Sequence, residues 1–181
     1  MNNFPPRCWR LLQPLDGVKT MLELGNKVTC HFEWKAAFEA MGIRHTSVDW
    51  NGKNRALVLD LRKPLGLGQF DAVTNFGTTE HVSEQEPVWR NIHEALKVGG
   101  LLVSETPMPG YWPGHGDFYP TFEFYREFAD KNGYQVERLY RDDEPLYSVD
   151  EPLRPVLSLR ARKLFDAAFI MPAAPLFRDP G

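Results

Sequence analysis

Acidic residues lie at or near the ends of three short strand-like segments of this chain, an arrangement that suits the binding of a nucleoside-containing ligand. Glu23 lies near the end of KTMLEL just before Gly25, Asp49 follows IRHTSV, and Asp60 ends ALVLD. Such binding needs a glycine turn that lets the backbone approach the ligand and an acid that takes the ribose hydroxyls. Asp49 lies 24 residues past Gly25, close to the spacing of about 20 expected of such an acid. The pattern predicts a binding site around Gly25, Asp49 and Asp60.

Two histidines are candidates for proton transfer. His81 follows Glu80 after the apolar segment FDAVTN, and His115 lies in a loop with Asp117 two residues on. A neutral histidine accepts a proton readily near physiological pH. The alternatives are that His81 merely ends a loop and that His115 is a solvated loop residue.

The loop around His115 is rich in proline, glycine and aromatic residues, and loops of this length inside compact domains are often functional. Its side chains could line a substrate site or close the core over the sheet. Those considered for the substrate are Tyr111, Trp112, Asp117 and Tyr119.

Several other chemistries lack their motifs. The sequence has neither the G-x-S-x-G of an esterase nor the GxxxxGK[ST] loop of a nucleoside triphosphatase. Cys8 and Cys30 are too few for a disulfide framework, and no third ligand is spaced to join His115 and Asp117 in a metal site. We therefore predict no metal.

The net charge and the distribution of apolar residues limit the kinds of partner that we expect. A net charge of −3 carries no basic footprint for nucleic acid. No stretch approaches the roughly 18 apolar residues of a membrane span, and the N-terminus lacks the apolar run of a signal peptide. We expect a cytoplasmic protein with a small-molecule substrate.

Strands and helices alternate along the chain, which predicts a parallel sheet with its ligand beyond the carboxyl ends of the strands. Apolar periodicity predicts three helices, over 31–41, after a capping box at 83–86, and over 121–132. The glycine pair Gly99-Gly100 is predicted to end the second helix. Seven strands are expected, at 19–24, 43–48, 56–59, 70–75, 101–104, 134–140 and 156–164.

The order of these segments resembles the class I S-adenosylmethionine-dependent methyltransferases, in particular the type 11-like domains. The resemblance covers about residues 19–165, between an irregular lead-in (1–18) with one short turn and a proline-rich tail (166–181) that could bind a protein partner. It implies a three-layer α/β/α Rossmann-like sandwich whose seven-stranded, mostly parallel sheet has an antiparallel last strand. It also implies S-adenosylmethionine as cofactor.

The resemblance further assigns roles to individual residues. Asp49 would bind the ribose and Trp50 would pack on adenine, although Trp50 could equally be a packing residue and Asp49 an Asx-turn residue. Asp60 would bind the adenine amino group with Leu61 beside it, or could simply end a strand. Asn75 and Phe76 would line the methionine end, and the glycine turn after the first strand would bind the cofactor through Glu23, Gly25 and Asn26.

The first motif departs from the family pattern E-x-G-x-G-x-G. Here it reads Glu23-Leu24-Gly25-Asn26-Lys27-Val28, so two glycines are missing. Asn26 could keep the turn, because asparagine tolerates the left-handed conformation. Lys27 stands where the carboxylate of methionine should lie. The leading hypothesis is methyl transfer to a small oxygen or nitrogen acceptor, with His81 and His115 as catalytic candidates. The alternative is a non-catalytic scaffold with the same fold in a larger assembly.

Overall fold

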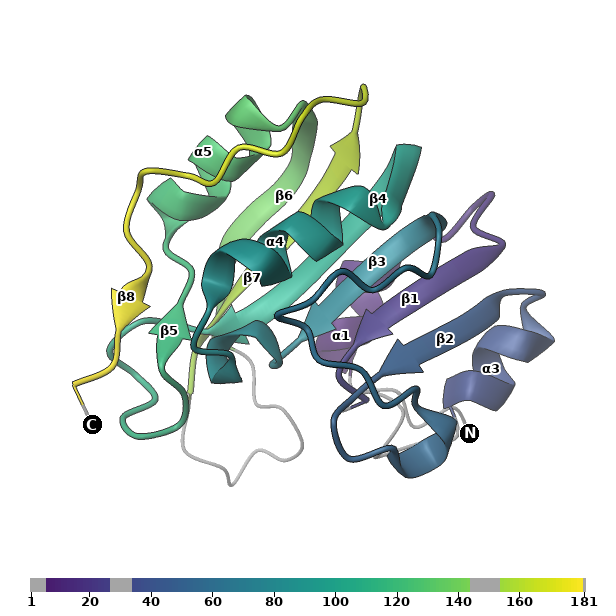
Figure 1. Ribbon diagram of the computed structural model, residues 1–181, viewed down its shortest axis with the longest axis horizontal. Helices are drawn as coiled ribbons and strands as arrows, with labels where there is room; N and C mark the ends of the chain where they lie inside the picture. The colour runs from purple at the N-terminus through teal and green to yellow at the C-terminus, as the bar shows by residue number, and fades with distance from the viewer. Residues whose placement is uncertain (1–5, 27–33, 144–153, 181) are drawn as a thin grey trace.

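A six-stranded sheet forms the centre of the molecule (Figure 1), in the order β2-β1-β3-β4-β7-β6. The computed structural model describes residues 6–26, 34–143 and 154–180. The strands are β1 (Thr20–Leu24), β2 (Arg44–Val48), β3 (Phe70–Phe76), β4 (Leu96–Pro107), β6 (Tyr134–Asp142) and β7 (Val156–Lys163).

The direction of the strands confirms the predicted topology. β1 pairs in parallel with both β2 and β3, and β3 pairs in parallel with β4. β7 runs antiparallel to its two neighbours, β4 and β6. The carboxyl ends of β1, β2 and β3 therefore meet at one edge, which is where parallel sheets bind ligands.

Helices cover both faces of the sheet. One face packs against α4 (Gln85–Glu94) and α5 (Phe122–Lys131), whose buried aromatic residues join Leu22, Val73 and Leu159 of the sheet in the larger core cluster. The other face packs against α1 (Pro6–Leu12) and α3 (Trp34–Ala40), where Phe38 contacts a second cluster that contains Met21. The three-layer sandwich is confirmed.

One of the seven predicted strands is reduced to a single bridge. Residues 56–59 do not form a strand, and Leu57 makes one isolated parallel bridge to Val48. The preceding 3-10 turn, η1 (Lys53–Arg55), holds Asn54 and Arg55 at positive φ. That reversal leaves too few residues in register to extend the sheet beyond β2.

Two predicted helix boundaries are wrong. The N-cap of α4 is Glu84, and it makes no side-chain cap hydrogen bond, so there is no capping box at 83–86. Gly99-Gly100 does not end this helix but lies within β4, where the register against β3 shifts. The predicted helix over 31–41 is described from Trp34, and residues 31–33 lie outside the described ranges.

Both ends of the chain contribute to the fold. The predicted irregular lead-in contains the helix α1. The buried side chain of Arg160 on β7 donates hydrogen bonds to the carbonyl oxygens of Leu11 and Leu12 at the end of α1. The C-terminal tail runs along α5 (Figure 1), and Ile170 donates to Asn132. It then forms β8 (Phe177–Arg178), which pairs with β5 (Phe118–Tyr119).

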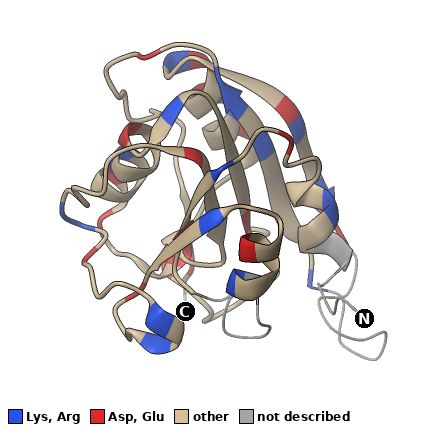
Figure 2. Cartoon of the chain, turned by 90° about the vertical axis from the view of Figure 1, so that its right-hand side faces the viewer, with Lys and Arg blue, Asp and Glu red and all other residues tan. Residues whose placement is uncertain are grey.

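Charged residues of both signs are interspersed on the side of the molecule seen in Figure 2. Among the helices of the described ranges, none is long and apolar enough to cross a membrane.

Candidate functional site

A cavity of about 650 Å³ opens at the carboxyl ends of β1 and β2. Its volume lies within the range of about 300–1,000 Å³ that is usual for small-molecule sites. The wall combines carboxylates with apolar side chains, and its lining residues include Gly25, Val48, Asp49, Trp50, Val58, Asp60, Leu61, Arg62, Thr78 and His81. Five of the nine residues predicted for the cofactor therefore share one cavity.

Gly25 permits a close approach at the end of β1. Its φ is +76°, and a Cβ placed on it would lie 2.2 Å from Oγ1 of Thr78. That hydroxyl donates a hydrogen bond to the carbonyl oxygen of Leu24 (2.9 Å). A side chain at residue 25 would displace Thr78 and would stand in the wall of the cavity. Two independent constraints, backbone conformation and space, thus select glycine here.

Asp49 and Trp50 lie together at the end of β2. Oδ1 of Asp49 accepts a hydrogen bond from the backbone N–H of Asn51 (2.9 Å), so the predicted Asx turn is present. Trp50 is 84% exposed, which excludes the alternative that it is a core packing residue. An exposed indole beside a cavity offers a flat apolar surface for a ring.

Asp60 is held by a residue that the sequence argument did not consider. Nε and Nη2 of Arg62 each donate to the Asp60 carboxylate at 2.9 Å, and the Arg62 backbone N–H donates at 3.0 Å. The hydrogen bonds from the Arg62 side chain, followed by that from its backbone, lower the pKa of Asp60 to about 2. Asp60 is therefore ionised at physiological pH. Its neighbour Leu61 is buried and shares the cavity wall.

Two residues predicted for the first motif lie outside the lining of this cavity. Glu23 is buried, with its carboxylate 3.2 Å from Nε2 of His45 on β2. Asn26 is also buried and donates from its amide to the side chain of Asn51 and the carbonyl oxygen of Lys53. Asn26 thereby ties the end of β1 to the turn after β2. Lys27 lies outside the described residues.

Asn75 and Phe76 are likewise buried and do not belong to the lining. The Asn75 amide donates to the hydroxyls of Thr79 and Ser104, and its carbonyl accepts from the Thr79 backbone N–H. Phe76 packs in the second core cluster on the opposite face of the sheet. Asn75 thus positions the short turn η2 (Thr79–His81) instead of facing the cavity.

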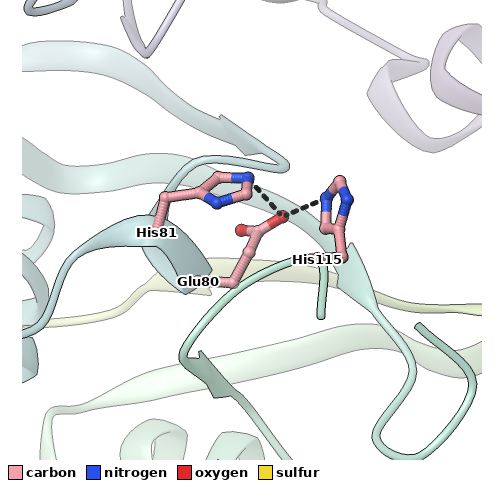
Figure 3. A group of neighbouring side chains, drawn as sticks. All are labelled: Glu80, His81 and His115. Carbon is pink, nitrogen blue, oxygen red and sulfur yellow. Dashed lines mark ion pairs between the residues drawn. The ribbon is translucent and has the colours of Figure 1, made fainter. Parts of the chain in front are cut away.

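The turn η2 brings Glu80 and His81 beside His115 (Figure 3). Nε2 of each histidine lies 3.9 Å from Oε1 of Glu80, and this carboxylate points between the two rings. The Glu80 side chain is fully buried, whereas those of His81 and His115 are 46% and 30% exposed. The sequence argument named both histidines but missed Glu80 as their common partner.

A second, smaller cavity of about 250 Å³ borders this cluster. It is lined by His81, Gly114, His115, Gly116, Asp117 and Asp179. His81 therefore belongs to the walls of both cavities. This shared wall is the geometric link between the predicted cofactor residues and the loop predicted to face a substrate.

The aromatic residues of the loop divide into two groups. Trp112 and Tyr119 are buried in a small core cluster with Val156, and Nε1 of Trp112 donates to the carbonyl oxygen of Pro155 (2.7 Å). Tyr111 is exposed, and its hydroxyl accepts a hydrogen bond from Arg141. Trp112 and Tyr119 thus close the core in this structure, and of the four residues considered for the substrate, Asp117 lines the smaller cavity.

Comparison with known proteins agrees with this architecture. Residues 36–104 match the family model described as a methyltransferase domain. No curated protein matches the sequence. The fold is similar to the 1,6-didemethyltoxoflavin-N1-methyltransferase of Burkholderia thailandensis, solved with 1,6-didemethyltoxoflavin and S-adenosylhomocysteine bound. Its TM-score is 0.63 at 17% identity, over 90% of this chain and 78% of that one.

The chain has the fold of the class I methyltransferase family. A second similar structure is the S-adenosylmethionine-dependent methyltransferase of Mesorhizobium loti, with a TM-score of 0.60 at 17% identity over 87% of this chain and 96% of that one. A third is the [4+2]-cyclase SpnF, also with a TM-score of 0.60 at 17% identity, over 87% and 79% of the two chains. The same fold thus carries more than one reaction, and activity has to be argued from the site.

Within this methyltransferase fold, the residues that sequence reasoning missed share one property. Thr78, Glu80 and Arg62 act through side chains that are brought to the site by irregular segments and turns, after β3 for Thr78 and Glu80 and after residues 56–59 for Arg62. Only the Asp60–Arg62 spacing of two residues is a local signal that the sequence could have revealed.

Proposed function

We propose that this protein transfers a methyl group from S-adenosylmethionine to an oxygen or nitrogen atom of a small acceptor. The observation that carries the proposal is the shared wall between the two cavities. His81 lines the cavity that contains Gly25, Asp49 and Asp60, and it also lines the cleft that contains His115. A methyl donor in the first cavity and an acceptor in the second would meet at this residue.

The residues of the larger cavity fit the cofactor. Gly25 lines this cavity without a side chain of its own, so its backbone can approach a ligand. Asp49 has a carboxylate on the cavity wall for ribose hydroxyls, and Trp50 offers an exposed ring for the base. Asp60, ionised beside Arg62, is an acceptor for an exocyclic amino group.

When bound, S-adenosylmethionine would supply an electrophilic methyl group on a sulfonium for transfer to the acceptor atom, with S-adenosylhomocysteine as the leaving group and loss of the acceptor's proton. The chain's own contribution is to hold the acceptor in line, and positioning can supply roughly 7–11 kcal/mol of such a barrier. We assign this positioning to His81 and His115.

The test is calorimetric titration with S-adenosylmethionine and S-adenosylhomocysteine. Asp49→Asn is the informative variant, because an asparagine Oδ1 can still accept the Asn51 N–H of the Asx turn while the charge is lost. Loss of one hydrogen bond to a charged group costs about 1.5–3 kcal/mol, which corresponds to roughly 10–150-fold weaker binding. Asp130→Asn, at an exposed position on α5, is the matched control and should bind like the wild type.

The alternative of a non-catalytic scaffold gives the opposite result. In that case neither ligand produces heat at millimolar concentration in a folded protein, and Asp49→Asn changes nothing. Micromolar binding that is weakened by Asp49→Asn but not by Asp130→Asn supports the cofactor site and justifies a screen of acceptors.

A further inference from the structure

We propose that Glu80, His81 and His115 bind one divalent transition-metal ion, and that this ion holds the acceptor at the boundary between the two cavities. The role of the ion in holding the acceptor rests on the proposed function, whereas the ion site itself rests on the three side chains alone.

The donor set selects the class of ion. Two imidazole nitrogens and one carboxylate oxygen form a set that suits Zn²⁺ in catalytic sites and Fe²⁺ in open three-ligand sites. Mg²⁺ and Ca²⁺ prefer an all-oxygen shell, which this cluster does not offer. A set of three protein ligands also leaves at least one coordination position for water or a substrate.

The distances are close to those of a bound site. One ligand atom from each of the three residues lies within 4.8 Å of the other two, and both Nε2 atoms lie 3.9 Å from Oε1 of Glu80. Ligands at about 2.0–2.2 Å from one ion lie roughly 3.0–3.5 Å from each other in tetrahedral or octahedral geometry. Each histidine therefore needs to move by less than about 1 Å, and both side chains are partly exposed.

The loop is built to keep His115 against Glu80. Asp117 donates its backbone N–H to the carbonyl oxygen of Glu80 (2.7 Å). A Cβ at Gly116 would lie 2.9 Å from that same oxygen, so glycine lets the loop lie directly on η2. The His115 ring packs 5.0 Å from Trp112 and 4.9 Å from His81, measured between ring centroids.

Burial of Glu80 gives the ion an electrostatic function. The carboxylate is fully shielded from solvent, and a buried carboxylate is stable only with compensating charge or hydrogen bonds. A divalent ion at the point where Figure 3 shows the two rings facing Oε1 would bring two positive charges to it. In this arrangement the histidines are ligands and do not act as bases.

The open coordination position explains how an acceptor would be activated. An acceptor hydroxyl that ligates the ion has a lowered pKa and releases its proton to water. The acceptor oxygen then forms a bond to the methyl carbon. The carbon–sulfur bond breaks at the same time, and the electron pair of that bond stays on sulfur. No oxidant or reductant is consumed.

The test titrates metal-free protein with ZnCl₂ and measures the zinc content after dialysis. We expect one Zn²⁺ per chain, with binding weakened at least roughly 100-fold in His115→Gln and in Glu80→Gln, because each removes a direct ligand. Asp130→Asn removes an exposed carboxylate elsewhere and should bind Zn²⁺ like the wild type. Circular dichroism establishes that each variant is folded, and if Glu80→Gln does not fold, His81→Gln and His115→Gln decide the question.

Two results would overturn the metal site. One is absence of stoichiometric Zn²⁺ binding, and the other is binding that is equally strong in the wild type and the histidine variants. Titration of the same metal-free preparation with S-adenosylhomocysteine separates this proposal from the previous one. Binding of S-adenosylhomocysteine without binding of Zn²⁺ refutes only the metal site. Binding of Zn²⁺ without binding of S-adenosylhomocysteine refutes only the cofactor site.

Discussion

Replacement of Gly25 by alanine should damage both stability and cofactor binding, and Gly42 provides a matched control. Both glycines have a φ of +76°, so alanine at either position pays the same conformational penalty of about 1–2 kcal/mol. Around Gly42 nothing lies within 4 Å of an added Cβ, whereas at Gly25 the Thr78 hydroxyl lies only 2.2 Å away.

The extra cost at Gly25 can be estimated from the contact it breaks. The hydroxyl of Thr78 must leave the carbonyl oxygen of Leu24, a hydrogen bond worth about 0.5–1.5 kcal/mol. Gly25→Ala should therefore lower the free energy of unfolding by about 1.5–3.5 kcal/mol, against about 1–2 kcal/mol for Gly42→Ala. It should also weaken S-adenosylhomocysteine binding, because the new methyl group stands in the cavity wall.

Urea unfolding of the two single variants, of Thr78→Ala and of the Gly25→Ala/Thr78→Ala double variant completes the assay. Removal of the Thr78 hydroxyl should relieve the clash, so the double variant should be more stable than the sum of the two single effects predicts. Equal losses in Gly25→Ala and Gly42→Ala, together with additive behaviour of the double variant, would refute the steric argument.

Three further outcomes are expected. Arg62→Met should raise the pKa of Asp60 from about 2 toward its usual 3.8, because the arginine's hydrogen bonds favour the carboxylate. A carboxyl NMR titration checks this, and an unchanged pKa would contradict the pairing. Arg160→Met should lower the free energy of unfolding by at least about 1–3 kcal/mol, because the carbonyl oxygens of Leu11, Leu12 and Pro14 lose the buried guanidinium that donates to them. Arg162→Met, which removes the ion pair of an exposed arginine, should cost at most about 1 kcal/mol in the same urea titration. Asp179→Ala should speed amide hydrogen exchange in the loop that contains Gly114 without affecting α4, since this carboxylate accepts the Gly114 N–H. Unchanged exchange would show that the C-terminal tail does not brace the loop.

Local sequence signals were sufficient to predict a strand where the burial of that strand alone determines its structure. The apolar runs that became β1, β3 and β7 were predicted close to their observed bounds, because a central strand of a sheet covered by helices on both sides is buried on both of its faces. The same signal failed at 56–59, where an apolar run of strand-like composition makes only one bridge. Composition reports burial, but sheet membership also requires register with a neighbour.

The residues of the site can be separated in the same way, into those placed by local sequence signals and those placed only by long-range contacts. The sequence by itself determined that Gly25, Asp49 and Asp60 follow strand-like segments, and the direction of a parallel sheet was enough to bring Gly25 and Asp49 to one cavity. Only the tertiary structure decided that Asn75 holds η2 instead of facing a ligand, and that His81 and His115 meet at Glu80. His115 lies 35 residues beyond Glu80 along the chain, and the loop that carries it between β4 and β5 has no periodicity that specifies its path. Its position follows from the packing of Gly116 on η2 and from the pairing of β5 with β8, which are long-range contacts that no local pattern encodes.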